Sequence, residues 1–587
     1  MEPSASPPGG LSLPDILVAR AQAHPEALAF RFLPDGTTDH PVDWTYRDVD
    51  RRSRAVREDL RRRGIEGGRV VLALDPGLDY VAGLFGILRA GCTAVPSFPP
   101  SGRRAVARFR SILADCEPRA VLTDGRFASK TSEFESSFAD DGPRRGVQWI
   151  FPDEPLPACD IDAEASPELA DPALIQYSSG STGDPKGIVL THEHLAANCR
   201  TLEAHVGMEP DRVGCSWLPP YHDMGLMGTI MLAVHGGWPL VMMAPGHFVQ
   251  DPHRWLKAVT EYRVTITVGP NFAFDLCASS IPDETLTELD LSSLRQVFCG
   301  SEPVSAATLE RFRERFARCG YDEAAVIPCY GLAEATLFVT GRPRATSGAV
   351  RTEPVLGAES GTRVVSCGVT AADHEVLVVD PETAKALPDG QVGEIWAAGP
   401  NVTTGYWRRP ELSAETFGAR LSGSGETDQA YLRTGDLGFV HDGELFVTGR
   451  LKDVIVVNGR NLYPQDLEAS VERCREELRR AAAFSMPGGA TGNAEEERVV
   501  VVAEYWGRSR QFASMERMLR TEVIAAVTAD HGVRPAELYF GPPGTVLTTT
   551  SGKVRRRATR DAFLQGRLKR FARPSVASVP SAGGAAR

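Results

Sequence analysis

The sequence predicts an α/β protein in which a large N-terminal domain with mixed sheets precedes a small α+β C-terminal domain. Apolar runs rich in β-branched residues, such as VVLAL at 70–74 and VTITV at 264–268, are typical of buried strands. They alternate with longer amphipathic patterns such as 46–63, as in other α/β proteins. Because 587 residues are too many for one core, several domains are expected.

The expected domains are an N-terminal domain over 1–450, a C-terminal domain over 451–573 and a disordered tail over 574–587. Segment 391–449 has short strands separated by glycine turns, and GRLKDVIVVNGRN at 449–461 precedes a new helical pattern. We expect the hinge between the domains at 450–453, with Lys452 at the pivot. The tail is rich in Pro, Ser, Gly and Ala, a composition that disfavours a packed core.

Composition excludes some partners. The net charge is −12, which argues against a protein built to hold nucleic acid or an anionic membrane, because both need a basic face. The 11 cysteines are scattered singly without a C-x-x-C pair, as in proteins of a reducing compartment. The start, MEPSASPPGG, lacks the regions of a signal peptide, and a cytoplasmic protein is expected.

One charge-poor stretch resembles a membrane span at first sight. Residues 224–246 contain no acidic or basic residue apart from His235, but Gly236, Gly237 and Pro239 interrupt the stretch. Neither half approaches the roughly 20 residues that a span needs. We expect a buried helix followed by a buried strand, LVMM, which either forms plain core or walls a channel for an alkyl chain.

The most informative segment is SSGSTGDPKG at 178–187. Glycines permit unusual dihedrals and close approach, so such a loop can direct backbone N–H groups, hydroxyls and one ammonium at a polyphosphate. A Walker A loop needs G-x-x-x-x-G-K-[ST], whereas Asp184 and Pro185 separate Gly183 from Lys186. An ordinary turn is the remaining alternative. The candidate phosphate contacts are Ser178, Ser179, Gly180, Ser181, Thr182, Gly183 and Lys186.

Four further motifs follow in order. YGLAE at 330–334 offers an aromatic ring for adenine and a carboxylate, Glu334, that suits magnesium. YLRTGD at 431–436 ends in Asp436, a carboxylate able to accept two ribose hydroxyl protons. GRLKD at 449–453 adds a sugar or phosphate contact, and TSGK at 550–553 supplies a lysine on a flexible glycine. Taken singly, Asp436 could cap a turn, Glu334 could be a solvated carboxylate and Lys553 an ordinary surface lysine.

Over almost its whole length the chain resembles the adenylate-forming superfamily of acyl-CoA synthetases, non-ribosomal peptide adenylation domains and luciferases. Within it, the sequence is most similar to fatty acyl-AMP ligases, which pass the acyl group to an acyl carrier protein. The strings that carry this resemblance are WLPPYHDMGLMG (217–228), FVQDPHRWLKAV (248–259), GPNFAFDLC (269–277), FCGSEPV (298–304), YGLAEATLFV (330–339) and GRNLYPQDLE (459–468).

The resemblance implies a fold, cofactors and site residues. The fold is that of adenylate-forming enzymes, and the cofactors are ATP and Mg²⁺. Thr182 and Glu334 lie near the metal, His222 lies at the fatty acid carboxylate, and Lys553 bridges carboxylate and α-phosphate; these four are the candidate catalytic residues. Asp436 and Arg450 hold the ribose, and the adenine is framed by Gly300, Ser301, Glu302, Pro303, Tyr330, Gly331, Leu332 and Ala333. The candidate acyl pocket residues are Met224, Gly228, Met231, Asn271 and Phe272.

The motifs specify adenylation, but they do not by themselves specify which molecule accepts the acyl group. A holo acyl carrier protein is expected, supplied by another chain because no carrier serine motif is apparent here. The cluster Lys553, Arg555, Arg556, Arg557 and Arg560 could steer an acidic carrier, or these arginines could merely solvate a terminal helix or pair with nearby acids. However, the region 341–366 is short for that family, which leaves CoA as an alternative acceptor. A non-catalytic acyl-AMP binding module is a further alternative.

Overall fold

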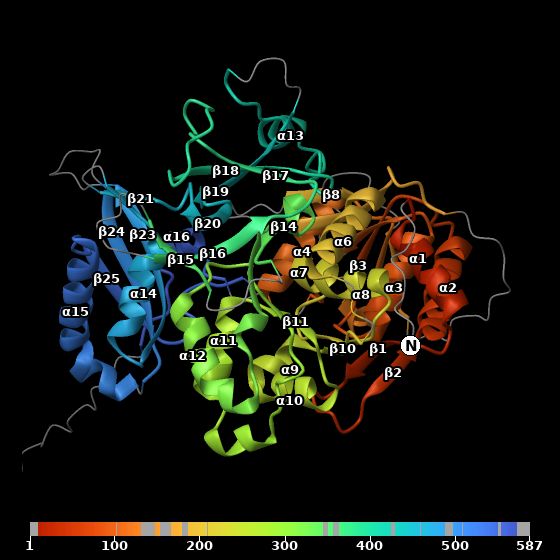
Figure 1. The fold of residues 1–587 in the computed structure, drawn as a ribbon, viewed down its shortest axis with the longest axis horizontal. Helices are drawn as coiled ribbons and strands as arrows, with labels where there is room; N and C mark the ends of the chain where they lie inside the picture. The colour runs from red at the N-terminus through yellow and green to blue at the C-terminus, as the bar shows by residue number, and fades with distance from the viewer. Residues whose placement is uncertain are drawn as a thin grey trace, which may run out of the picture. The chain divides into compact units, whose positions relative to one another are not determined.

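In this computed structural model, residues 10–100, 103–130, 147–152, 166–178, 186–207, 209, 211–343, 350–355, 363–423, 429–457, 460–487, 497–507, 509–549 and 553–571 are described. The chain divides into two compact units, one ending at Leu451 and the other beginning at Lys452. Each unit is described by itself below (Figure 1).

The first unit contains a six-stranded sheet in the order β6-β5-β3-β4-β7-β8. All neighbours pair in parallel except β7 and β8, which are antiparallel. The strands are β3 (Arg69–Ala73), β4 (Thr93–Pro96), β5 (Ala120–Thr123), β6 (Gln148–Ile150), β7 (Pro172–Ser178) and β8 (Lys186–Thr191). Alternate residues of β3 enter different core clusters, Val70 and Leu72 in one and Val71 and Ala73 in the other. The strand is therefore buried on both faces.

A 14-stranded sheet, counted over the described residues, forms the rest of this unit, in the order β17-β18-β19-β20-β16-β14-β13-β12-β11-β9-β10-β1-β2 with β15 beside β16. Its parallel part comprises β1 (Leu28–Leu33), β9 (Gly214–Ser216), β10 (Leu240–Met243), β11 (Ile266–Gly269), β12 (Gln296–Cys299) and β13 (Val326–Gly331). Its antiparallel part comprises β2 (Val42–Thr45), β14 (Phe338–Gly341), β15 (Thr352–Pro354), β16 (Arg363–Thr370), β17 (Glu375–Val379), β18 (Gly393–Ala398), β19 (Leu432–His441) and β20 (Glu444–Arg450). Mixed sheets were predicted and are confirmed.

The helices of the first unit are α1 (Leu13–Ala23), α2 (Tyr46–Arg62), α3 (Leu78–Arg89), α4 (Arg103–Cys116), α6 (His192–Val206), α7 (Asp223–Gly225), α8 (Leu232–Gly236), α9 (Pro245–Gln250), α10 (His253–Glu261), α11 (Asn271–Ser280), α12 (Ala306–Phe316) and α13 (Pro410–Phe417). Short turns of other helix types are η1 (Gly125–Lys130), η2 (Leu226–Met231), η3 (Asp283–Glu288), η4 (Ala317–Cys319), η5 (Glu323–Ala325) and η6 (Ala333–Ala335). Helix α2 begins with a capping box in which Thr45 and Asp48 satisfy each other's backbone N–H.

The charge-poor stretch forms α7, η2, α8 and the four fully buried residues of β10. A buried helical segment followed by a buried strand is therefore confirmed, although a π-helical turn interrupts the α-helix. No helix in the described part of the chain is long and apolar enough to cross a membrane.

The second unit is a small α+β domain. Its strands are β21 (Ile455–Val457), β22 (Arg460–Leu462), β23 (Leu478–Pro487), β24 (Glu497–Tyr505) and β25 (Glu537–Gly541), and its helices are α14 (Pro464–Cys474), α15 (Ser509–His531) and α16 (Arg556–Leu564). Val499 and Val501 of β24 enter a cluster with α14 and α15, whereas Val500 and Val502 enter one with Ala562 of α16. Helices therefore cover both faces of the β23-β24-β25 sheet.

Candidate active site

The predicted phosphate loop connects β7 to β8. Ser178 pairs with Lys186 across this antiparallel ladder. The remaining predicted contacts, Ser179, Gly180, Ser181, Thr182 and Gly183, lie outside the described residues. A Walker A loop is followed by a helix, whereas this loop is followed by a strand, so the strand–loop–strand arrangement agrees with the exclusion of a P-loop from the sequence.

The far edge of β8 is covered by residues 405–407. Val189 N donates to Gly405 O at 3.1 Å and Trp407 N donates to Gly187 O at 2.6 Å. A Cβ atom on Gly187 would lie 2.6 Å from Ile175 Cγ2 and 3.1 Å from Tyr177 Cζ. The strand that follows the predicted phosphate loop is thus packed closely on several sides, and its glycine permits this approach.

Glu334, the predicted magnesium ligand, lies in η6 beside Tyr406. The Tyr406 hydroxyl donates to Glu334 Oε1 at 2.9 Å, and Lys186 Nζ lies 5.4 Å from the centre of the Tyr406 ring. Burial raises the pKa of Glu334, while the hydrogen bond from Tyr406 opposes this rise. Glu334 is therefore a partly buried carboxylate that accepts a hydrogen bond. The alternative that it is a solvated helix carboxylate is excluded.

The YGLAE segment is held by a close backbone approach. A Cβ atom on Gly331 would lie 1.7 Å from the carbonyl oxygen of Leu337, a distance that only glycine permits at this position. Leu332 is half-buried and Ala333 is buried. This part of the motif therefore positions Tyr330 and Glu334 on either side of a rigid turn.

Asp436 joins two other predicted site residues. The Tyr330 hydroxyl donates to Asp436 Oδ2 at 2.8 Å, and Arg450 Nε lies 3.0 Å from Asp436 Oδ1. The contact with Arg450 follows from the register of the β19–β20 pair, in which Asp436 lies opposite Arg450. Burial and then the charge of Asp436 raise the pKa of Tyr330, so its hydroxyl stays a donor. Asp436 accepts from side chains and does not merely cap a turn.

The other residues predicted to contact adenine lie in the loop after β12. Gly300 lies against Cys329, with a built Cβ 2.8 Å from Cys329 Sγ, and Ser301 has a φ of 73°. The Glu302 carboxylate accepts a 2.7 Å hydrogen bond from Phe272 N near the start of α11, where negative charge is favourable. The Glu302 side chain thus connects this loop to α11, and Pro303 continues the loop toward α12.

The predicted acyl residues lie on two elements. Met224 and Met231 are buried, and a Cβ atom on Gly228 would lie 2.9 Å from Leu337 Cδ2. Half-buried Phe272 meets Trp217 edge to face at 6.0 Å, and Asn271 Oδ1 accepts from Ser305 N at 2.9 Å. These contacts place the residues in or against the core, and their role toward an acyl chain stays a prediction.

His222 precedes the charge-poor segment, as the sequence indicates. It is the residue before α7, and its Nδ1 lies 2.5 Å from Asp223 Oδ1. Its side chain is 24% exposed, so the imidazole remains accessible to a small polar group.

Lys452 and Lys553 belong to the second unit. Lys452 is exposed and begins this unit. The predicted flexible glycine, Gly552, lies outside the described residues. The backbone of Lys553 is bonded to Thr549: Thr549 N donates to Lys553 O at 2.8 Å and Lys553 N donates to Thr549 Oγ1 at 3.0 Å. The residues on either side of Lys553 and Thr549 therefore pair antiparallel, with a bridge between Thr548 and Val554.

Arg556 does not belong to the expected surface cluster. Its Nε and Nη2 atoms donate to Glu468 at 2.7 and 2.6 Å, and its side chain is 19% exposed. The expectation of a five-residue basic patch is wrong for this member, because a buried carboxylate binds its guanidinium. The hydroxyl of Tyr406 and the Arg556–Glu468 pair were both missed from the sequence, since no local pattern indicates such distant partners.

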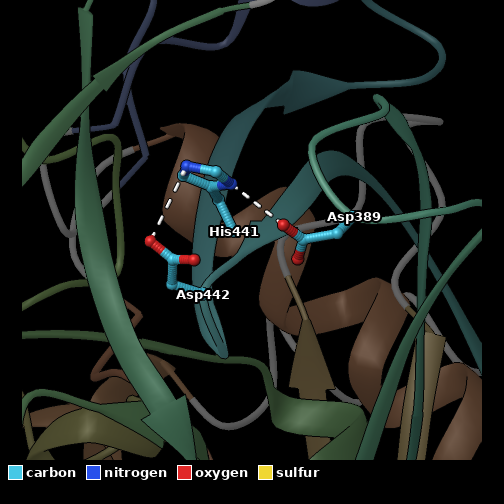
Figure 2. Close-up of side chains that lie close together, drawn as sticks. All are labelled: Asp389, His441 and Asp442. Atoms are coloured by element: carbon cyan, nitrogen blue, oxygen red, sulfur yellow. Dashed lines mark hydrogen bonds and ion pairs between the residues drawn. The ribbon is translucent and has the colours of Figure 1, made fainter.

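A separate cluster of Asp389, His441 and Asp442 could suggest a metal site (Figure 2). His441 Nδ1 lies 2.9 Å from Asp389 Oδ2, and its Nε2 lies 3.8 Å from Asp442 Oδ2. Arg351 Nη2 already donates to the same Asp442 oxygen at 2.9 Å. A cation would compete with this guanidinium, so the cluster is a polar network beside the β19–β20 turn, made of the His441–Asp389 hydrogen bond and the Arg351–Asp442 ion pair.

Comparison with known proteins identifies the class. The family of AMP-binding enzymes matches residues 17–407. The chain is 35% identical to the medium-chain-fatty-acid–[acyl-carrier-protein] ligase JamA of Moorena producens, covering 98% of this chain and 99% of that protein. It is 37% identical to the long-chain-fatty-acid–AMP ligase FadD32 of Mycolicibacterium smegmatis, covering 96% of each.

A solved structure extends the match to the fold. The fatty acid AMP ligase of Legionella pneumophila superposes with a TM-score of 0.70 at 33% identity, covering 96% of this chain and 97% of that one. The fold and site therefore define an AMP-binding, adenylate-forming enzyme. Within that superfamily the chain belongs to the fatty acyl-AMP ligases.

Proposed function

We propose that this ligase activates a fatty acid with ATP and then transfers the acyl group to the phosphopantetheine thiol of a holo acyl carrier protein. The observation that carries the nucleotide half of the proposal is Asp436, held between the Tyr330 hydroxyl and Arg450. Each carboxylate oxygen accepts more than one hydrogen bond, so Asp436 retains acceptor capacity for ribose hydroxyls. The Gly300 to Pro303 loop and Tyr330 would frame the adenine.

In the first half-reaction, a carboxylate oxygen of the fatty acid attacks the α-phosphorus in line. The bond from that phosphorus to the bridging oxygen of the β-phosphate breaks, and pyrophosphate leaves. Phosphoryl transfer asks the protein chiefly for positioning and charge neutralisation. Lys186 and Lys553 would supply positive charge, and His222 would orient the fatty acid carboxylate.

Mg²⁺ fits the donors on this side of the site. A partly buried carboxylate oriented by a tyrosine hydroxyl, as Glu334 is by Tyr406, is a hard oxygen ligand of the kind that Mg²⁺ prefers. Thr182 is the second proposed ligand. When bound, Mg²⁺ would neutralise charge on the phosphates, and the role of Glu334 would be to stay ionised and oriented.

In the second half-reaction, the thiol sulfur attacks the acyl carbonyl carbon, the bond from carbon to the phosphate oxygen breaks, and AMP leaves while the thiol proton passes to solvent. JamA is an acyl-carrier-protein ligase by its name, which supports a carrier as acceptor here. Exposed Arg557, with Arg555 and Arg560, would steer an acidic carrier.

All ten cysteines in the described part of the chain are free, which supports a reducing compartment such as the cytoplasm.

The test is mass spectrometry of products from ATP and a panel of fatty acids, with CoA and holo carrier protein offered in parallel. We expect acyl-carrier thioester to form faster than acyl-CoA at equal acceptor concentrations. Equal or faster formation of acyl-CoA would show that CoA is an acceptor, as the short region 341–366 suggested, and the protein would then be an acyl-CoA synthetase. Absence of fatty-acid-dependent pyrophosphate exchange would refute the proposal altogether.

Two variants separate the half-reactions. Lys553→Ala should lower adenylation by at least roughly two orders of magnitude while supplied acyl-AMP is still transferred, because this lysine acts only in the first transition state. Arg557→Glu should slow transfer to the carrier in low salt and leave acyl-AMP formation unchanged. Arg517→Glu, at an exposed position of α15, is the matched control for charge.

A further inference from the structure

We propose that Arg556 is a positioning residue for Lys553, and that its fork-shaped ion pair with Glu468 holds the lysine segment in place for adenylation. This inference rests on the proposed role of Lys553. Arg556 is the first residue of α16 and follows Lys553 by three positions. Whatever fixes the start of α16 therefore limits where the lysine backbone can lie.

The contact is bidentate and largely buried. Arg556 Nε donates to Glu468 Oε1 at 2.7 Å and Nη2 donates to Oε2 at 2.6 Å. The Glu468 side chain is only 8% exposed. Burial alone would lower the pKa of the Arg556 guanidinium, but attraction to Glu468 and Asp453 raises it. Two parallel hydrogen bonds fix orientation as well as distance, which a lysine ammonium cannot do.

Glu468 is itself fixed to the domain core. It lies on α14, and its Oε1 also accepts a 2.9 Å hydrogen bond from Ala483 N of β23. One carboxylate thus joins α14, β23 and the start of α16. Three arginines, 555–557, lie at the positive end of the α16 dipole, which is unfavourable. The negative charge of Glu468 offsets this repulsion where α16 begins.

The connection continues to Lys553 through the backbone. Arg555 N donates to Leu547 O at 2.7 Å, and Leu547 N donates to Thr559 Oγ1 of α16 at 3.0 Å. The segment 547–549, which is bonded to Lys553, is therefore also bonded to the helix that Arg556 anchors. Displacement of α16 would move the lysine, and misplacement by about 1 Å can lower a rate by roughly 100-fold.

Arg556 also reaches the segment beside the proposed pivot. Its Nη1 lies 3.5 Å from Oδ2 of Asp453, the residue after Lys452. The same guanidinium thus links the beginning of the second unit to its lysine segment. The whole connection lies within this unit, so it would be kept if the unit reorients about the proposed pivot.

The experiment measures both half-reactions in Arg556→Ala, with Arg475→Ala as the matched control. Arg475 forms an equally forked pair with Glu522, at 2.8 Å for both bonds, in the same unit but with side chains that are 33% and 36% exposed. We expect adenylation to fall about 10- to 100-fold in Arg556→Ala, while transfer from supplied acyl-AMP stays within about twofold of wild type. Arg475→Ala should retain both activities.

A double variant separates positioning from general damage. If Arg556 acts through Lys553, Arg556→Ala should cause little further loss of adenylation in a Lys553→Ala background. A loss that adds fully to that of Lys553→Ala, or an equal loss in both half-reactions, would overturn the proposal. Arg556→Lys should not restore adenylation, because it lacks the fork, and full recovery would also contradict the proposal.

Glu468→Gln changes the other partner of the same ion pair, and it replaces Arg556→Ala as the test if that variant does not fold. We expect the same selective loss of adenylation, with a melting temperature recorded for every variant. Wild-type enzyme that lacks fatty-acid-dependent pyrophosphate exchange would refute the proposed function. Wild-type enzyme with normal exchange, together with normal adenylation by Glu468→Gln, would instead refute the positioning role alone.

Discussion

The hydroxyl of Tyr330 donates a 2.8 Å hydrogen bond to Oδ2 of Asp436, a residue 106 positions later in the chain. This contact joins the end of β13 to β19 within the first unit, so the proposed adenine and ribose contacts are mechanically connected. The Tyr330 ring is 8% exposed, and its orientation is therefore set by both packing and the carboxylate.

The first prediction concerns this pair. Tyr330→Phe should raise the KM for ATP by about tenfold, because a buried charged acceptor loses a donor worth about 1.5–3 kcal/mol. Initial rates at varied ATP concentration measure the effect. Tyr431→Phe is the matched control, since Tyr431 donates to Glu375 at 2.8 Å in a similar pair outside the proposed site. An unchanged KM in Tyr330→Phe would contradict a role of the pair in nucleotide binding.

The second prediction concerns Glu334. Tyr406→Phe removes the donor that orients and favours the ionised carboxylate. We expect roughly 3- to 30-fold more Mg²⁺ to be needed for half-maximal adenylation, with transfer from supplied acyl-AMP unaffected. A Mg²⁺ titration of pyrophosphate exchange measures the change. An unaltered titration would exclude Tyr406 from the metal side of the site.

The third prediction concerns the pivot. Lys452→Pro fixes φ at the first residue of the second unit and should impair one half-reaction while sparing the other, according to the orientation that is trapped. Lys452→Ala keeps the backbone free and should retain both. Stopped assays of acyl-AMP formation and thioester formation distinguish the two steps. Equal impairment of both steps in a folded Lys452→Pro protein would argue against a hinge here.

The fourth prediction concerns acyl chain length. Gly228→Trp should move the preferred fatty acid to shorter chains, each lost buried methylene being worth about 0.8 kcal/mol. Gly246→Trp is the control, because a Cβ atom at Gly246 meets no atom within 4 Å. Met231→Trp is less suitable, since Met231 is fully buried and overpacking destabilises a core. The same chain-length profile in Gly228→Trp and wild type would remove this residue from the pocket.

The fifth prediction concerns stability and pH. Burial lowers the pKa of His192 from 6.5 to about 4. Between pH 6.5 and about 4 the unfolded chain binds a proton at His192 that the folded chain does not bind. The free energy of unfolding therefore falls as pH falls through this range, by about 3 kcal/mol in total. Melting temperature should therefore decline less steeply with acidification in His192→Gln than in wild type. His441→Gln, at a 41% exposed side chain, should follow the wild-type curve, and identical curves for all three proteins would contradict the assignment.

Local signals predicted much of this molecule, and their limits have physical reasons. The charge-poor stretch, the helix at 46–62 and the α/β alternation follow from hydrophobic periodicity, which depends on near neighbours. The expected strand at 264–268 instead begins at Ile266. A turn at residues 262–263, in which Arg263 adopts a φ of 52°, precedes it, and Val264 and Thr265 lie between the turn and the strand. Motif order predicted Tyr330, Glu334 and Asp436 as site residues, and the structure joins two of them, Tyr330 and Asp436, by a hydrogen bond.

Local signals could not predict hydrogen-bonded pairs of residues that lie far apart in the sequence. Tyr406 reaches Glu334 across 72 positions and Glu468 reaches Arg556 across 88. No periodicity encodes these pairs, since they depend on which strands and helices become neighbours. Arg556 was consequently interpreted as a surface charge, although its side chain faces a carboxylate.

The backbone of residues 405–407 also has a consequence for solubility. Strand β8 lies at the end of its six-stranded sheet, and an uncovered terminal strand would offer unpaired N–H and C=O groups to another molecule. The hydrogen bonds from Val189 to Gly405 and from Trp407 to Gly187 occupy this edge instead. The chain thereby protects one of its own sheets against edge-to-edge aggregation at the point where the phosphate loop ends.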